Sequence, residues 1–211
     1  MTDLVADAYA TIPTFRTFIR NAGTSDATDP DSALELLALE AAARAIDRAC
    51  GRKFDAAAAT ATARVFTAAR SPLWRYVVDI DDLADPATIT SVKFDATGDG
   101  DYTTTTTAYR VGPANAVARG LPYTRIIFDA GTYATLVEEG VQVTAKWGWT
   151  AIPTTIQNAN LIQAARFLKR RDSPFGVAGS PEMGNELRLL AKLDPDVALM
   201  IAAFKRNWGA V

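Results

Sequence analysis

The chain has 211 residues, of which 49% are hydrophobic, and its 22 basic residues are nearly balanced by 24 acidic ones. These values predict an ordered globular protein and exclude a polycation that would bind nucleic acid over its whole surface. With no histidine and one cysteine, the chain lacks an internal disulfide and the commonest metal ligand and general base.

The first ten residues, MTDLVADAYA, carry acids where a secretory signal needs basic residues, and no run of 18 apolar residues occurs. We therefore expect neither secretion nor a membrane span, and synthesis in a cytosol. The main charge asymmetry is a mildly basic C-terminal third, because residues 151–211 carry eight basic and five acidic side chains.

Two helices are predicted within the first 54 residues. Pro13 begins a short helix whose apolar side comprises Phe15, Phe18 and Ile19. Ser32 and Glu35 have the spacing of a capping box, which predicts a second helix from Ser32 to about Arg48.

The second helix is rich in alanine, which permits the close approach of another helix. Glu40 and Arg44, four residues apart, are predicted to form an exposed ion pair. The expected inward face consists of Leu34, Leu37, Ala41, Ala45 and Ile46.

From Asp55 to Gly148 the hydrophobic period changes to two, which predicts an antiparallel β segment of five or six strands. Asp99-Gly100 favours a tight hairpin. Strict alternation places Val141, Val143, Ala145 and Trp147 on one face of a strand that Gly148 ends. Other residues expected on inward faces are Trp74, Tyr76, Val78, Ile80, Val92, Phe94 and the run from Arg125 to Phe128.

Two more helices are predicted after the β segment. Pro153 fits the start of the first of these helices, which is predicted from Ile156 to Lys169. The apolar residues of this helix cover more than one face, so either its own domain or a neighbouring chain should bury it. After a segment at residues 172–186 that is expected to be mobile, Asp194 caps a final helix beginning at Pro195. This helix is expected to show Val197, Met200, Ile201 and Phe204 toward a partner surface.

The motif search gives no reaction centre and no cofactor site. Asp95, Asp99 and Asp101 fail the calcium-loop register, so a hairpin turn accounts for them better. Cys50 has no evident base and is interpreted as a small buried hydrophobe. Lys169-Arg170-Arg171 suits a helix C-terminus better than a phosphate site.

The order of elements is more informative than any single motif. Ala41 to Phe54 has the pattern A-A-x-R-x-I-D-R-x-C-G-R-x-F, and Gly148 to Ile156 has G-W-x-x-I-P-x-x-I. With the flanking helices, at roughly residues 9–54 and 141–207, the chain resembles the head-tail connector (adaptor) proteins of tailed bacteriophages and gene transfer agents.

This resemblance implies an α+β fold, in which residues 1–54 and 151–211 form a small bundle of about four helices and residues 55–150 form an inserted antiparallel β domain. It implies a non-enzymatic virion protein of the neck, assembled in the bacterial host cytoplasm, that forms a ring of twelve subunits below the portal protein and above a stopper or tail-completion protein. Double-stranded DNA would pass through the ring without sequence-specific binding, and no membrane or cofactor is involved. The implied contacts with the portal or a ring neighbour are Arg170, Arg171, Phe175, Phe204, Lys205, Arg206 and Trp208.

Three alternatives remain. The chain could be another tail-completion or stopper protein of the virion. It could be a nucleic-acid-binding module that uses Arg166, Lys169, Arg170, Arg171 and the tryptophans, although the alternation places Trp147 in a core. A carboxylate hydrolase would need two converging acids, and Asp79, Asp81 and Asp82 form the one dense cluster, which a solvated strand face explains more simply.

Overall fold

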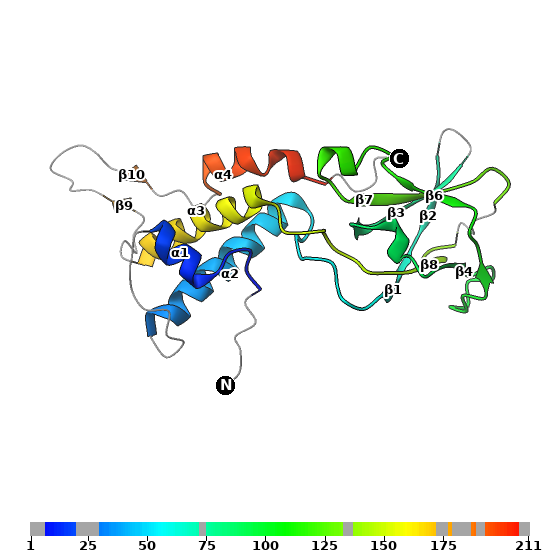
Figure 1. The fold of residues 1–211 in the computed structure, drawn as a ribbon, viewed down its shortest axis with the longest axis horizontal. Helices are drawn as coiled ribbons and strands as arrows, with labels where there is room; N and C mark the ends of the chain where they lie inside the picture. The colour runs from blue at the N-terminus through cyan, green and yellow to red at the C-terminus, as the bar shows by residue number, and fades with distance from the viewer. Residues whose placement is uncertain are drawn as a thin grey trace. The chain divides into compact units, whose positions relative to one another are not determined.

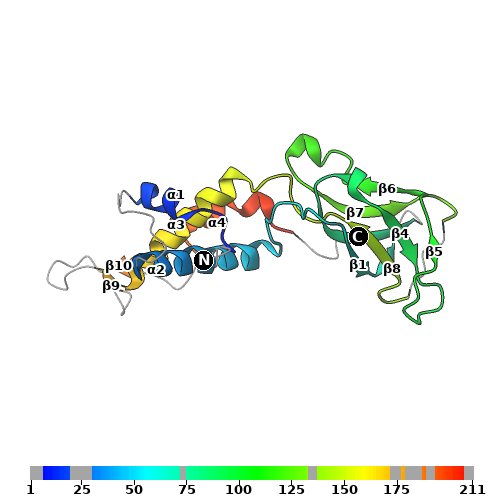
Figure 2. The same ribbon diagram turned by 60° about the horizontal axis from the view of Figure 1, so that its bottom comes forward.

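The computed structural model describes residues 7–19, 30–71, 75–132, 137–171, 177–178, 187–188 and 193–206. These residues divide into two compact units. The helical unit lies within residues 1–54 and 152–206, and the β unit lies within residues 55–151. Figures 1 and 2 show that the α-helices belong to the helical unit and the two larger sheets to the β unit, which confirms the predicted α+β class.

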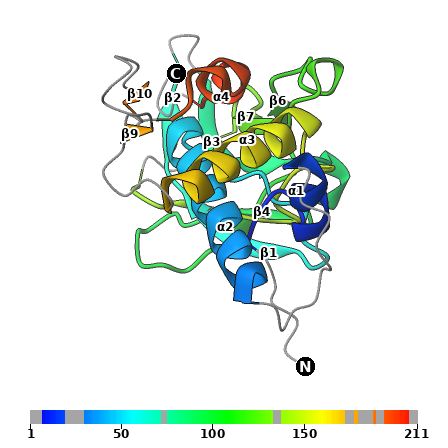
Figure 3. The same cartoon turned by 90° about the vertical axis from the view of Figure 1, so that its left-hand side faces the viewer.

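The helical unit is built on two long helices that pack along each other, α2 (Pro30–Cys50) and α3 (Thr154–Arg171). Helix α1 (Ile12–Phe18) packs against both, and α4 (Pro195–Met200) packs against α3, as Figure 3 shows. The 3-10 turn η4 (Ala202–Phe204) follows α4, and β9 (Val177–Ala178) pairs antiparallel with β10 (Leu187–Arg188). The core between the helices contains Phe15, Leu39, Ala42, Leu161 and Ala164.

Helices α1 and α4 begin with local side-chain caps, of which the one on α4 was predicted from the sequence. The Thr11 hydroxyl oxygen accepts from the Thr14 amide at the start of α1, and Asp194 accepts from the Asp196 amide at 2.9 Å at the start of α4. Pro195 occupies the first position of α4, as expected, and Pro153 precedes α3.

The predicted capping box of α2 is wrong. The helix begins at Pro30, so Ser32 lies in its first turn and not at the cap. Arg16 of α1 instead donates to the Glu35 carboxylate at 2.7 Å and to the Ser32 hydroxyl at 2.9 Å. The side chains that the local pattern assigns to capping, those of Ser32 and Glu35, thus bind the buried Arg16 guanidinium of α1.

The predicted inward face of α2 is also wrong, because Leu34, Leu37 and Ala41 are exposed and only Ile46 of the expected set is fully buried. Helix α2 has two apolar stripes, and its neighbours cover the other one, which consists of Leu36, Leu39, Ala42, Ala43 and Ile46. The predicted Glu40–Arg44 pair is replaced by bonds from Arg44 to the carboxylates of Asp7 and Asp47, at 2.9 and 3.1 Å. In α1, Phe15 is buried as expected, but Phe18 is nearly half exposed.

The β unit contains two antiparallel four-stranded sheets, so the prediction of five or six strands was too low. The first has the order β1-β8-β4-β5 and the second β2-β3-β7-β6. Their bounds are β1 (Thr62–Phe66), β8 (Val141–Ala145), β4 (Ser91–Phe94), β5 (Thr104–Thr105), β2 (Ala68–Arg70), β3 (Tyr76–Leu83), β7 (Tyr123–Phe128) and β6 (Tyr109–Gly112).

One apolar core joins the two sheets of the β unit, and the rings of Phe94 and Phe128 meet in it at 5.0 Å. The alternation predicted for residues 141–147 is confirmed, since the four expected inward residues are buried. Gly148 has a φ of 131°, and an added Cβ would lie 2.8 Å from the Ala57 Cα, so only glycine fits where the two chain segments cross.

Candidate functional site

Two kinds of feature are not found in the described part of the chain. The described part of the chain contains no group of three or more acids or cysteines that could hold a metal ion. Among the same residues, none of the helices is long and apolar enough to cross a membrane.

Cys50 lies at the end of α2 and is 1% exposed. Burial raises the pKa of its thiol to about 11, against the opposing effect of the Arg52 guanidinium. The thiol is therefore protonated at neutral pH, and the nucleophile is the thiolate, so the geometry supports the interpretation of Cys50 as a buried hydrophobe.

The acids of β3 have separate structural partners. Arg64 donates to the Asp81 carboxylate at 2.5 Å, and the Trp149 indole N–H donates to the buried Asp82 carboxylate at 3.1 Å. The Asp82 backbone oxygen also accepts from the Gly148 amide. These bonds tie β3 to the segments that flank it, and they favour a structural role over a catalytic pair of carboxylates.

The Asp95 carboxylate organises the loop between β4 and β5. It accepts from the backbone amides of Thr97, Gly98 and Gly100, at 3.0, 2.7 and 2.8 Å. Desolvation alone would raise the pKa of Asp95, but these hydrogen bonds outweigh it and lower the pKa below its ordinary value. The loop spans residues 95–103, so the predicted tight turn at Asp99-Gly100 is wrong, while the turn interpretation of the aspartates is supported.

The tryptophans named as possible base-stacking residues are core residues. Trp147 and Trp149 are each 4% exposed, and the Trp147 indole N–H donates to the Thr62 carbonyl oxygen at 2.9 Å. Arg166, another candidate nucleic-acid contact, binds the Asp194 carboxylate at 2.7 Å. Neither indole ring presents a face on which a base could stack.

Three of the residues implied as portal or neighbour contacts lie together at the end of the helical unit where α2 terminates. The Phe204 ring packs edge-on against Phe54 at 5.9 Å, and the Arg206 amide donates to the Cys50 carbonyl oxygen at 2.8 Å. Lys205 between them is exposed. The sequence expectation that Val197 and Ile201 face a partner is wrong, because both are fully buried within this unit.

Arg170, another implied contact, belongs to a different part of the helical unit. Arg170 lies one turn beyond Arg166, which binds the first residue of the α4 cap, whereas Phe204 lies at the far end of α4 and η4. The Arg171 side chain, Phe175 and Trp208 lie outside the described residues.

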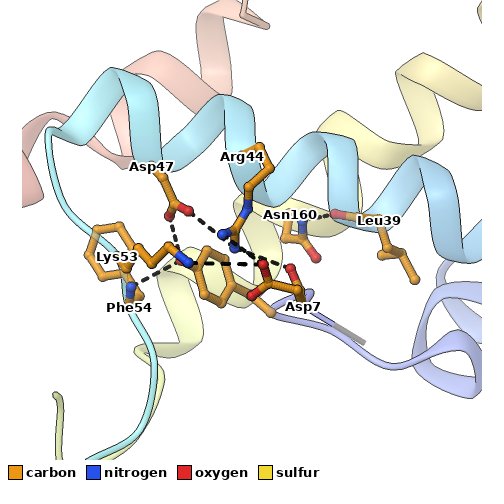
Figure 4. A network of polar contacts seen from close by, with 8 residues as sticks. Asp7, Leu39, Arg44, Asp47, Lys53, Phe54 and Asn160 are labelled. Atoms are coloured by element: carbon orange, nitrogen blue, oxygen red, sulfur yellow. Dashed lines mark hydrogen bonds and ion pairs between the residues drawn. The ribbon is translucent and has the colours of Figure 1, made fainter. Parts of the chain in front are cut away.

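A polar network that sequence reasoning missed surrounds the C-terminal half of α2 (Figure 4). The Tyr9 hydroxyl donates to the Asp47 carboxylate and accepts from the Phe54 amide. Asn160 of α3 donates to the Leu39 carbonyl oxygen at 2.9 Å. These bonds link segments far apart in sequence, and the motif around residues 42–54 marks the helix end that they hold.

Comparisons with known proteins give a likeness in structure alone. No family model matches the sequence, and no curated protein matches it. A solved chain described as "Neck of empty GTA particle computed with C6 symmetry" is 22% identical, with a TM-score of 0.59, over 99% of this chain and 96% of that one. A chain from the neck of a native GTA (gene transfer agent) particle, computed with C12 symmetry, has a TM-score of 0.54 with the same identity and coverage. The resemblance stated from sequence is thus confirmed for the fold.

Proposed function

We propose that this protein is a structural head-tail connector (adaptor) subunit in the neck of a phage-like particle. The observation that carries the proposal is the extent of the likeness, because it spans 99% of this chain and 96% of the neck chain. Both units are therefore accounted for, with no large addition that would require a different role. The buried, protonated Cys50 and the structurally occupied acids of β3 are consistent with a role without catalysis.

The proposed assembly is a ring of twelve copies between the portal protein and a stopper or tail-completion protein. Sixfold and twelvefold symmetry in the two neck particles supports a ring of this size. A head-to-tail contact repeated around a circle closes when the rotation between subunits divides the circle. The net charge of −2 suits a channel through which double-stranded DNA slides, since many phosphate contacts would hold it in place.

Within this assembly we assign the portal contact to the end of the helical unit. The helical parts at residues 1–54 and 151–211 would form the connector core, and residues 55–150 would form the inserted domain. Lys205 is exposed beside Phe204, whose ring packs on Phe54, so an exposed cation lies next to a packed pair of rings. Arg170, Arg171, Phe175, Arg206 and Trp208 are proposed as further contacts with the portal or a ring neighbour.

A pull-down on the immobilised portal protein of the same particle tests the function and the contact separately. We expect the chain to be retained, the Lys205→Glu variant to be retained at least tenfold less, and the Lys146→Glu variant to be retained normally. Lys146 is the matched control because it is also exposed but lies in the β unit. Retention of Lys205→Glu at the normal level would refute the contact, and no retention of the unchanged chain would refute the connector function.

A further inference from the structure

An apolar stripe on α2 faces away from the core of the helical unit. Leu34 is 42% exposed, Leu37 is 65% exposed, and Ala41 follows one turn later. Their spacing of three and four residues places them on one helix face, opposite Leu39 and Ala42. Arg48 continues the same face and is exposed. We call these four residues, Leu34, Leu37, Ala41 and Arg48, the α2 patch.

A second exposed apolar area lies on α4 and η4. Leu199 is 78% exposed, and Ala202 and Ala203 beside it are exposed as well. Val197 and Ile201 hold the other side of the helix against the core. Asp196 is exposed at the edge of this area. We call Asp196, Leu199, Ala202 and Ala203 the α4 patch.

The two patches lie on different sides of one compact unit. Figures 1 and 3 show α3 between α4 and the N-terminal part of α2, and α3 packs against both helices. The buried faces of α2 and α4 contact the unit's core, so the exposed faces are directed outward on the two sides of α3. Two different patches on opposite sides are what a head-to-tail contact between copies requires.

The charges at the edges of the patches have opposite signs. Within the described residues, neither the Arg48 nor the Asp196 side chain has an ion-pair partner. An α2 patch placed against another α2 patch would leave Arg48 without an acid. An α2 patch placed against an α4 patch puts a basic edge and an acidic edge in the same interface.

We propose that the α2 patch of one copy packs against the α4 patch of the next copy, and that this repeated contact builds the ring. The inference rests on the proposed connector function, because the symmetry of the two neck particles is what favours a second copy as the occupant. Leu37 and Leu199 form the centre of the contact, and Arg48 and Asp196 set its polarity.

Cysteine cross-linking tests this contact even where the association of the free chain is weak. The double variant Leu37→Cys/Leu199→Cys is oxidised at high concentration, with and without the portal protein. We expect a ladder of covalent multimers that extends beyond the dimer, since each copy can join two neighbours. Each single variant alone should remain monomeric, and an equal mixture of the two should stop at the dimer.

Two controls accompany this experiment. The unchanged chain is oxidised in parallel, because its Cys50 is buried and should not react. The variant Leu37→Cys/Val117→Cys carries the second thiol at an apolar residue that is 66% exposed but lies in the β unit, and it should give no ladder. A ladder from this control at the same rate would show random collision and overturn the proposal.

Charge reversal provides a second readout. Arg48→Asp and Asp196→Arg should each reduce the ladder of the double-cysteine variant at least fivefold, and both changes in one chain should restore it. A dimer from Leu37→Cys alone, or no ladder with or without the portal, would overturn the contact. If the portal pull-down then still succeeds, the connector function stands and only the ring contact is wrong.

Discussion

The two units of this protein are stabilised in different ways. The β unit has one continuous apolar core between its sheets, and its buried acids, Asp82 and Asp95, accept hydrogen bonds from an indole N–H and from loop amides. The helical unit also buries apolar residues between its helices, and the buried polar residues in its described part are Arg16, Ser32, Glu35, Asn160 and Gln163.

This difference bears on the contacts proposed with other subunits. Buried polar pairs permit few alternative registers, because each donor must meet its acceptor. The helical unit therefore fixes its helix packing by polar bonds such as Arg16–Glu35, and it can leave Leu37 and Leu199 on the outside. We infer that the helical unit is the part built for contact with other subunits.

The largest expected effect comes from breaking the polar core of the helical unit. Arg16→Ala leaves the Glu35 carboxylate, whose side chain is 4% exposed, without its cation, so we expect a loss of about 3–5 kcal/mol in the free energy of unfolding. Urea denaturation followed by far-UV circular dichroism measures it. The double variant Arg16→Met/Glu35→Met should recover most of the loss, and a double variant as unstable as the single one would contradict the account.

Leu37 and Leu39 of α2 test which face of the helix is buried. Leu39→Ala should cost about 2–5 kcal/mol because Leu39 is fully buried. Leu37→Ala should change stability by no more than about 0.5 kcal/mol, since its side chain is mostly exposed. The same denaturation experiment compares them, and equal losses would mean that α2 is rotated relative to the helix described here.

A smaller effect is expected at the polar bond between strand β3 and the segment after β8. Trp149→Phe removes the indole N–H that donates to the buried Asp82 carboxylate, which should cost about 1–3 kcal/mol. Calorimetry measures the shift of the thermal transition. Adding Asp82→Leu should return part of the loss, because the carboxylate no longer needs a donor. No loss of stability from Trp149→Phe alone would contradict the importance of this bond.

The smallest effect concerns the Cys50 thiol and pH. Its pKa rises from 9.0 to about 11 in the folded chain, so below pH 9 the thiol is protonated whether the chain is folded or unfolded. Between pH 9 and 11 the unfolded chain releases its proton first, and stability falls as the pH rises. The stability difference between the unchanged protein and Cys50→Ala should therefore shrink across this range, and a constant difference would exclude a buried thiol.

Sequence reasoning succeeded where the alternation of hydrophobic residues alone decides which side chains are buried. In β8 the residues alternate between core and surface, so Val141, Val143 and Ala145 could be assigned to the core without knowing the partner strand. The caps at Thr11 and Asp194 are equally local, although only the second was predicted.

Sequence reasoning failed where the choice depends on what lies nearby in space. Helix α2 has apolar residues on two sides, and only the positions of α1 and α3 decide which side is inward. Ser32 and Glu35 fit a capping box as well as they fit a distant arginine, and a pattern of four residues does not contain Arg16. The Tyr9–Asp47 bond likewise joins residues 38 apart and leaves no periodic signal.

Light scattering tests the central claim most directly, by giving the molar mass of this protein alone and after mixing with the portal protein. The connector account predicts a stoichiometric complex with one copy of this chain for each portal subunit, even if the free chain is a monomer. A chain whose mass is unchanged by the portal would contradict the account.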